Sequence, residues 1–166
     1  MKQLLLIRHA KSSWESADIT DFDRPLNERG KKDAPIMAKR LYDRGITIDL
    51  FVSSPAKRAR KTAELFATAY EYPKKDIIFF PGLYEPTTEA FYEAVAGLEN
   101  KYETVAMFSH NPGITLFAAG LTNVAIDDMP TCAVFGVKCK AKQWEQFREK
   151  EKTFWLFDFP KADHSA

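Results

Sequence analysis

The chain has 166 residues, enough for one domain whose hydrophobic core needs no disulfide bonds. Apolar residues make up 45% and charged residues 28%, as in ordinary globular proteins, and the formal net charge of +1 argues against a dedicated nucleic-acid binder. No stretch approaches the roughly 20 apolar residues of a membrane span, and the N-terminus lacks the pattern of a signal peptide. We therefore expect a single cytoplasmic domain over residues 1–166 with a frayed tail at 160–166.

The first unit of the chain is predicted to be a strand followed by a helix. The run QLLLIR at 3–8 is apolar without polar alternation, which is typical of a strand buried on both faces. In residues 27–45 the apolar positions share one helical face, and Gly45 is placed to end that helix. Pro35 lies inside the pattern, so the helix either begins near Asp33 or is kinked.

The middle of the chain repeats the alternation. A second buried strand is predicted at 49–54, and a third at 76–80. In the helix between them, Ser54 is expected to be the N-cap and Pro55 the first helical residue.

The last part of the chain adds two helices and three strands. A helix is predicted at 87–98 and a strand at 104–109, after which Asn111 and Pro112 repeat the N-cap and proline pattern at the start of another helix. The last two strands are expected at 132–139 and 153–159.

Strands that alternate with helices predict an α/β fold, a three-layer α/β/α sandwich with a mostly parallel central sheet. The last two strands, joined by a polar connection, are expected to form an antiparallel edge. The two cysteines, Cys132 and Cys139, are an odd number of residues apart in one predicted strand, so they face opposite sides and do not pair. Free cysteines agree with a reducing compartment.

Polar clusters follow three of the predicted strands. Arg8 and His9 end the first strand, Arg58 lies near the start of the helix after the second, and His110 follows the strand at 104–109. Ligands of open parallel sheets bind at the carboxyl ends of the strands, so these four side chains converge if the strands are neighbours. Two arginines, two histidines and helix N-termini make a site suited to a phosphoryl group.

Each of these signals is weak when taken singly, because solvated loops and exposed helices carry the same residue types. The joint pattern is stronger, since two of only three histidines fall at strand ends. The third, His164, we assign to the tail. Four further cations are expected either to line the mouth of the pocket or to serve solubility alone: Lys11, Arg24, Lys31 and Lys32.

The segments LLLIRHAKS, DRPLNERG, SSPAKRARKTAE and SHNPGI together resemble the histidine phosphatase superfamily, also called phosphoglycerate mutase-like. The resemblance spans nearly all of residues 2–159 and is greatest to the SixA-type phosphohistidine phosphatases. It implies the phosphoglycerate mutase-like fold, with His9 as nucleophile, Arg8 and Arg58 as phosphoryl ligands and His110 as second active-site histidine. The usual Arg-His-Gly of the superfamily ends in Ala10 here, which is tolerable if its backbone is not left-handed.

The resemblance implies a phosphatase that works through a phosphohistidine intermediate without a metal or another cofactor. Ser12 and Asn111 are further candidates for binding the phosphoryl group. An alkyl ester also needs a proton donor, because its alkoxide leaves poorly. The candidate is Glu85, with Glu89 behind it, although an exposed loop carboxylate is an equal interpretation; Asp21 and Asp23 are weaker candidates.

A phosphohistidine substrate relaxes the demand for an acid, because the conjugate acid of imidazole has a pKa of about 6.5. The connections at 10–27 and 80–90 are too short for a large lid, which suits a phosphate displayed on another protein. We therefore expect a monomeric phosphatase acting on phosphohistidine of a partner protein, with no nucleic-acid or membrane partner. The alternatives are a phosphatase for small phosphoesters and a non-catalytic phosphate-recognition module.

Overall fold

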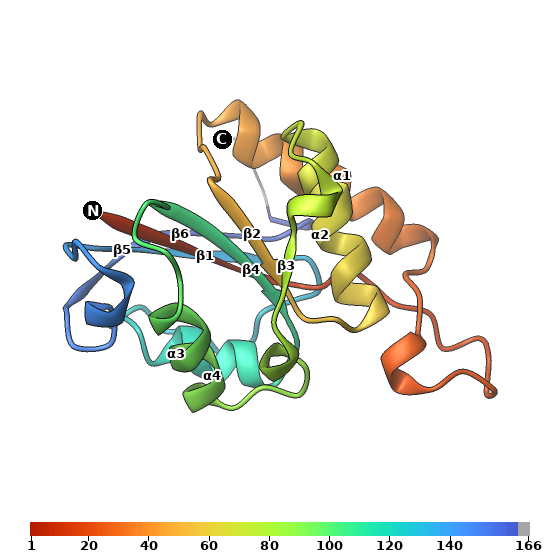
Figure 1. Ribbon diagram of the computed structural model, residues 1–166. Helices are drawn as coiled ribbons and strands as arrows, with labels where there is room; N and C mark the ends of the chain where they lie inside the picture. Colours follow the sequence, from red (N-terminus) through yellow and green to blue (C-terminus); the bar gives the residue numbers. More distant parts are fainter. Residues whose placement is uncertain (163–166) are drawn as a thin grey trace.

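A six-stranded sheet forms the centre of the computed structural model, which describes residues 1–162 (Figure 1). The strand order is β3-β2-β4-β1-β5-β6. The strands are β1 (Lys2–Arg8), β2 (Leu50–Ser53), β3 (Ile78–Phe79), β4 (Thr104–Ser109), β5 (Val134–Cys139) and β6 (Lys152–Asp158). The helices are α1 (Glu28–Asp43), α2 (Lys57–Ala69), α3 (Thr88–Ala96) and α4 (Gly113–Ala119).

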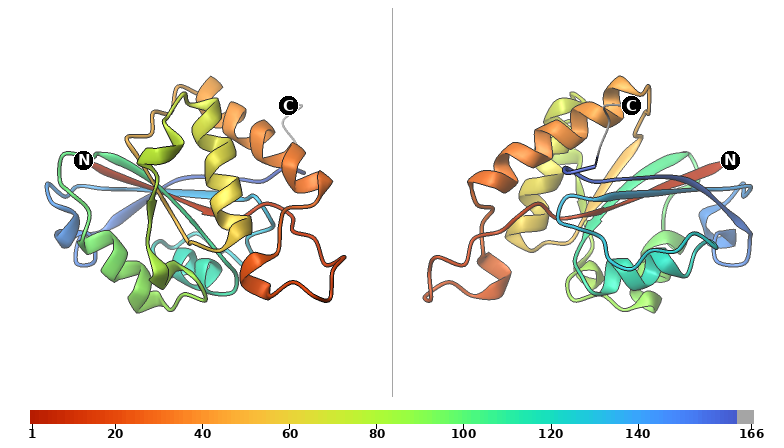
Figure 2. Two further views of the ribbon diagram at one scale, coloured as in Figure 1. Left: turned by 45° about the vertical axis from the view of Figure 1, so that its right-hand side comes forward. Right: turned by 180° about the vertical axis from the view of Figure 1, so that it is seen from behind.

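Helices cover both faces of the sheet, because successive residues of a buried strand point to opposite sides. Leu4 and Leu6 of β1 join the core under α3 and α4, whereas Leu5 and Ile7 join the core under α1 and α2. Both views in Figure 2 show the sheet between these two helix pairs. The predicted three-layer α/β/α architecture is therefore confirmed.

The sheet is mostly parallel, and the last two strands form its antiparallel edge, both as predicted. β1, β2, β3 and β4 pair in parallel, and β5 is antiparallel to both β1 and β6, so β6 forms the edge. Residues 120–133 return the chain to the carboxyl end of β1, where Cys132 N donates to the carbonyl oxygen of Arg8 (3.1 Å). From that point β5 can only run back along β1.

The first helix is longer than Pro35 suggested. Asn27 caps α1 by accepting a hydrogen bond from Gly30 N (2.9 Å), and the helix continues through Pro35 to Asp43. A start near Asp33 is therefore wrong. Gly45 follows the helix with a left-handed φ of 77°, as its predicted role in ending the helix requires.

The next two helix starts were predicted too early. Ala56, not Ser54, is the N-cap of α2, so Pro55 lies before the helix. Likewise α4 begins at Gly113 after Pro112. In both cases the expected capping side chain has other partners, which belong to the pocket described below.

One prediction near the C-terminal end also needs correction. Cys132 precedes β5 in a left-handed conformation, so the cysteines do not share a strand, although both are free and buried. Arg40 donates to the carbonyl oxygens of Phe159 (3.0 Å) and of Pro160 (3.1 Å), the first residue of the predicted tail. His164 lies outside the described residues. Within residues 1–162 no helix is long and apolar enough to cross a membrane.

Candidate active site

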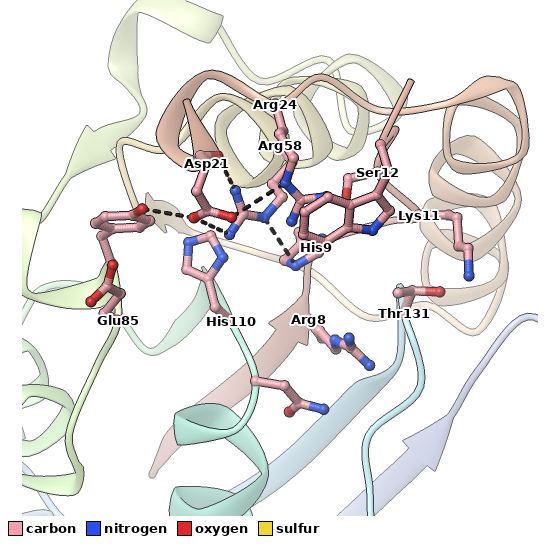
Figure 3. Close-up of a pocket in the computed structure, with 13 residues that line it drawn as sticks. Arg8, His9, Lys11, Ser12, Asp21, Arg24, Arg58, Glu85, His110 and Thr131 are labelled. Carbon is pink, nitrogen blue, oxygen red and sulfur yellow. Dashed lines mark hydrogen bonds and ion pairs between the residues drawn. The ribbon is translucent and has the colours of Figure 1, made fainter. Parts of the chain in front are cut away.

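The carboxyl ends of β1, β4 and β2 meet at one edge of the sheet and deliver the polar residues that the sequence singled out. Arg8 ends β1 and pairs with Ser109, which ends β4. His9 and His110 follow these two strands directly, and their ring centroids are 5.1 Å apart. Arg58 reaches the same point from the first turn of α2, with its Nε 3.4 Å from His9 Nε2 (Figure 3). The predicted convergence of these four residues is confirmed.

These residues line a cavity of about 350 Å³. All seven predicted site residues contribute to its lining, and sequence reasoning also named Lys11, Asp21 and Arg24 in other roles. It did not identify the remaining three lining residues, Trp14, Tyr84 and Thr131. The full lining consists of Arg8, His9, Lys11, Ser12, Trp14, Asp21, Arg24, Arg58, Tyr84, Glu85, His110, Asn111 and Thr131.

A backbone contact fixes the hydrogen of the His9 ring. His9 Nδ1 lies 2.8 Å from the carbonyl oxygen of Ala10, which can only accept, so Nδ1 carries the hydrogen and Nε2 carries the lone pair. Burial, followed by the positive charges of Arg58 and Arg8, lowers the pKa of His9 to about 3. The imidazole is therefore neutral near neutral pH, as a nucleophile must be.

The loop after β1 is held to α2 by Thr62. Ala10 N donates to Thr62 Oγ1 (3.0 Å), and the same hydroxyl donates to the carbonyl oxygen of Arg58 (2.7 Å). This link fixes the nucleophile relative to the helix that carries Arg58. The backbone of Ala10 is not left-handed, so alanine fits in place of the glycine in the Arg-His-Gly pattern described above.

Ser54 explains both the late start of α2 and the orientation of His110. Its oxygen accepts a hydrogen bond from Ala56 N (3.2 Å), and the same hydroxyl lies 2.7 Å from His110 Nε2. When this hydroxyl donates to Nε2, the hydrogen of the His110 ring lies on Nδ1. Burial, the neighbouring His9 and the charge of Arg58 together lower the pKa of His110 to about 2.

Two buried nitrogens of the pocket lining are suited to an anion. Arg8 Nη1 donates to the carbonyl oxygen of Met129 (2.8 Å), but Arg8 Nε is buried without a hydrogen-bond partner among the described residues. The same is true of His110 Nδ1. Both nitrogens belong to residues that line the pocket, and their unpaired burial is unfavourable until an acceptor such as a phosphoryl oxygen binds them.

Asp21 is bound to Arg58. Arg58 Nη1 donates to the carbonyl oxygen of Asp21 (2.6 Å) and Nη2 to Oδ2 of its carboxylate (3.1 Å), and Tyr84 donates to the same Oδ2 (2.7 Å). Burial would raise the pKa of Asp21, but hydrogen bonds from Tyr84 and Arg58 and the charge of Arg58 hold it at about 2. The carboxylate is therefore ionised and is not a proton donor in this arrangement.

Comparison with known proteins agrees with this geometry. The sequence profile described as "Histidine phosphatase superfamily (branch 1)" matches residues 4–91. The chain belongs to the histidine phosphatase superfamily. The structure of a protein assigned as the phosphohistidine phosphatase SixA of Agrobacterium tumefaciens is 25% identical with a TM-score of 0.79, over 96% of this chain and 98% of that chain. A tungstate complex of the protein histidine phosphatase SixA is 24% identical with a TM-score of 0.80, over 95% and 97% of the two chains.

Relatives by sequence are more diverse. An uncharacterised chloroplast protein of Arabidopsis thaliana is 28% identical over 87% of this chain and 70% of its own length. A 2,3-bisphosphoglycerate-dependent phosphoglycerate mutase of Gloeothece citriformis is 41% identical, over 43% of this chain and 31% of the mutase. The chain thus spans less than half of the length of the mutases that it matches. Superfamily membership and the likeness to SixA support phosphatase activity.

The structure shows which of the candidate proton donors of this histidine phosphatase lie in the pocket. Glu85 lines the pocket, is exposed and has a left-handed φ of 49°. Glu89 does not line the pocket, and Arg148 binds both of its carboxylate oxygens (2.9 and 2.6 Å). Asp23 also lies outside the lining and accepts from Thr20 Oγ1 (3.0 Å). Glu85 is the one predicted donor that keeps a suitable place.

The two further candidates for binding the phosphoryl group already have protein partners. Ser12 Oγ accepts from Arg24 Nη1 (2.6 Å). Asn111 donates to Asp128 Oδ1 (2.8 Å) and accepts from Thr115 Oγ1 (2.6 Å), which explains why it does not cap α4. Either side chain would have to exchange a partner to bind a phosphoryl oxygen.

The rim is only partly as predicted. Lys11 and Arg24 line the pocket, whereas Lys31 and Lys32 do not. The guanidinium of Arg24 stacks 3.5 Å from the ring centroid of Trp14, which is 77% exposed. Among the described residues, no group of three or more histidine, cysteine, aspartate or glutamate side chains is placed to hold a metal ion.

Proposed function

We propose that this chain is a metal-independent phosphatase in which His9 forms a phosphohistidine intermediate, and that its substrate is phosphohistidine on a partner protein. The observation that carries the proposal is the Nε2 lone pair of a neutral, buried His9, set beside Arg8, Arg58 and His110. A site for phosphate binding alone does not need a nucleophilic imidazole at its centre.

The reaction has two displacements at phosphorus. In the first, His9 Nε2 forms a bond to phosphorus while the bond from phosphorus to the substrate nitrogen breaks. The substrate imidazole leaves as a neutral ring when its other nitrogen carries a proton. In the second, water attacks phosphorus, the bond to His9 breaks, and the protons of water remain on the released phosphate and the surrounding solvent.

Electrostatic stabilisation falls to three side chains around the phosphoryl oxygens. Arg8 and Arg58 supply positive charge, and His110 supplies its Nδ1 hydrogen. Such positioning and charge stabilisation account for most of the catalysis in phosphoryl transfer. Arg58 must give up its contact with His9 Nε2 before attack, and its Nε is then free for a phosphoryl oxygen.

We propose the substrate class from the strength of the proton donors that the pocket offers to the leaving group. Asp21 is ionised, and Glu85 is an exposed residue of the lining. A departing imidazole has a conjugate-acid pKa of about 6.5, against roughly 15.7 for water, which an alkoxide resembles. A P–N bond therefore suits a site with a weak acid or none. The likeness to a structure assigned as a phosphohistidine phosphatase supports the same class.

The mechanism is tested by trapping the intermediate. A protein labelled with radioactive phosphate on histidine is mixed with the enzyme, the reaction is quenched in base, and the enzyme is digested to locate acid-labile label. We expect label on His9, its absence in His9→Ala and its retention in His164→Ala. Label on another residue would overturn the mechanism, and phosphate binding without label or turnover would establish a recognition module instead.

The rival substrate class, small phosphoesters, rests on the position of Glu85 in the pocket lining. The Glu85→Gln variant separates the two classes when phosphohistidine and an alkyl phosphate are compared. We expect phosphohistidine hydrolysis to change by less than about twofold, because a general acid that matters contributes roughly 100-fold or more. A 100-fold loss on alkyl phosphate, with wild-type turnover of that ester above that of phosphohistidine, favours the rival.

A further inference from the structure

A second concave surface, which we call the basic groove, is lined by residues that are sequence neighbours of residues of the active-site pocket. It has a volume of about 280 Å³. Its cations come from the start of α1 and from one face of α2, and two apolar residues lie between them. The groove residues are Pro25, Leu26, Lys31, Lys57, Arg60, Lys61 and Glu64.

The basic groove and the pocket share the same two chain segments. Arg24 lines the pocket, and the next residue, Pro25, lines the groove. In the same way Lys57 lines the groove and Arg58 lines the pocket. The backbone also joins the two sites, because Ser12 of the pocket forms a β-bridge with Leu26 of the groove and Ser13 N donates to the carbonyl oxygen of Pro25 (2.9 Å). A molecule whose phosphoryl group reaches His9 therefore has the groove beside it.

Helical geometry separates the roles of the α2 cations. Lys57, Arg60 and Lys61 are spaced i, i+3 and i+4, so they share one face of the helix. Lys57 and Arg60 are exposed and Lys61 is half-buried, whereas Arg58 is turned inward and buried. The groove cations are thus a separate set from the phosphoryl-binding arginine.

The position of these cations is unfavourable for the helix itself. The N-terminus of a helix carries a partial positive charge, and each exposed cation there costs about 0.3–1 kcal/mol. The first turn of α2 nevertheless holds no acidic residue. Stabilisation of the helix end therefore does not explain the charge of Lys57.

Little in the protein neutralises the groove. Lys31 lies 3.5 Å from Glu28, but both side chains are exposed, and such a pair exchanges readily with other partners. Glu64 is the one acidic residue of the groove lining. Within residues 1–162, no ion pair involves Lys57, Arg60 or Lys61. The whole chain carries a formal charge of only +1, so this surface concentrates positive charge locally.

We propose that the basic groove docks an acidic segment that flanks the phosphohistidine of the substrate protein. This inference rests on the proposed function and adds a requirement on the substrate, namely carboxylates next to the modified histidine. Charge complementarity of this kind speeds encounter and selects the partner. The groove acts on recognition and leaves the chemistry at His9 unchanged.

Two synthetic peptides test the proposal. They are identical around a single phosphohistidine but are flanked on both sides by glutamates in one and by lysines in the other, and free phosphohistidine is the third substrate. We expect the enzyme to prefer the glutamate peptide by roughly tenfold in kcat/KM, equivalent to about 1.4 kcal/mol. The K57E/R60E/K61E variant is expected to lose or reverse this preference and to hydrolyse free phosphohistidine at the wild-type rate.

The chain offers a matched control at the opposite edge of the sheet. Lys138, Lys140 and Lys150 line another groove, and Lys138 pairs with Gln3 at the amino-terminal end of β1, away from His9. K138E/K140E/K150E changes the net charge by the same amount and is expected to keep the preference.

The outcomes separate the docking proposal from the function beneath it. An enzyme that hydrolyses none of the three substrates overturns the proposed function. Hydrolysis of all three without preference, a preference that survives K57E/R60E/K61E, or an equal loss in K138E/K140E/K150E overturns docking in the basic groove. Loss of preference in the groove variant alone supports it, as does its decline as salt shortens the Debye length below about 10 Å.

Discussion

Asp21 binds the guanidinium of Arg58, which is a proposed ligand of the phosphoryl group. Both terminal nitrogens of Arg58 donate to Asp21, one to its carboxylate and one to its carbonyl oxygen. Its side chain is 48% exposed, so the ion pair is worth at most about 1 kcal/mol. A contact of this strength is readily exchanged, and Asp21 therefore competes with the substrate without closing the site.

The Asp21→Asn variant is expected to bind oxyanions more tightly. Removing a competing charge worth about 1 kcal/mol raises the affinity for inorganic phosphate or tungstate roughly fivefold. Isothermal titration, or inhibition of phosphohistidine hydrolysis, measures the change. Asp23→Asn, on the same turn but outside the pocket lining, is expected to leave the affinity unchanged. Weaker binding by Asp21→Asn would instead show that Asp21 positions Arg58 for the substrate.

The sequence predicts the residues that follow strands and misses those that depend on contacts between loops. Arg8, His9 and His110 were predictable because the ends of buried strands in a parallel sheet meet at one edge. The bond from Tyr84 to Asp21 joins loops 63 residues apart in the chain, and neither loop has a periodic pattern. Only the folded backbone brings these two residues together.

At the level of elements, the helices were predicted in place, but the starts of α2 and α4 were not. Ser54 and Asn111 have the residue types of N-caps, yet they bind His110 and Asp128 in or near the pocket. A capping preference is worth about 1 kcal/mol, so a tertiary hydrogen bond of similar strength overrides it. The errors in helix boundaries thus coincide with the site.

The contact between α1 and the loop after β1 depends on Gly30. A Cβ at this position would lie 2.2 Å from the carbonyl oxygen of Lys11 and 2.9 Å from its nitrogen. Both atoms belong to the backbone, so the helix or the loop must move. Lys11 adjoins Ser12 of the pocket, and its carbonyl oxygen accepts from Asn27 N (2.9 Å) at the start of α1.

Gly30→Ala is expected to destabilise the fold and to lower activity by displacing the loop that carries Ala10 and Ser12. Overpacking of this kind costs about 1–3 kcal/mol, which urea denaturation measures. Gly97→Ala is the matched control, because the nearest atom to its Cβ would be 3.6 Å away and its φ is −84°. Equal stabilities of the two variants would show that the α1 contact adjusts without strain.

At the scale of the whole molecule, local sequence patterns predict most of the strands and the helices but not the order and direction of the strands in the sheet. Local patterns predicted β1, β2, β4 and β5 and the helical layers, because burial on both faces leaves a continuous apolar run. The buried strand predicted at 76–80 is wrong, because β3 is only Ile78–Phe79 and both residues are exposed. Local patterns did not predict that β1 lies between β4 and β5, since pairing of Gln3 with Thr104 is decided by how the two cores pack. The direction of β5 likewise follows from the path of residues 120–133 rather than from a pattern within β5.

The two buried histidines make global stability depend on pH. His9 and His110 have pKa values of about 3 and about 2 in the folded protein, below the ordinary 6.5. Between these values the unfolded chain binds more protons, so the free energy of unfolding falls as pH falls below about 6.5. The slope is up to about 1.4 kcal/mol per pH unit for each histidine.

Urea unfolding in phosphate-free buffers between about pH 4.5 and 6.5 measures this slope, and the double variant His9→Gln/His110→Gln is the comparison. Asp21 does not interfere, because its pKa is lowered from 3.8 to about 2 and its stabilising effect is lost only below that range. We expect the double variant to have a shallower slope whatever its absolute stability. Equal slopes would mean that the folded protein protonates both rings, and a neutral His9 nucleophile at acidic pH would then be wrong.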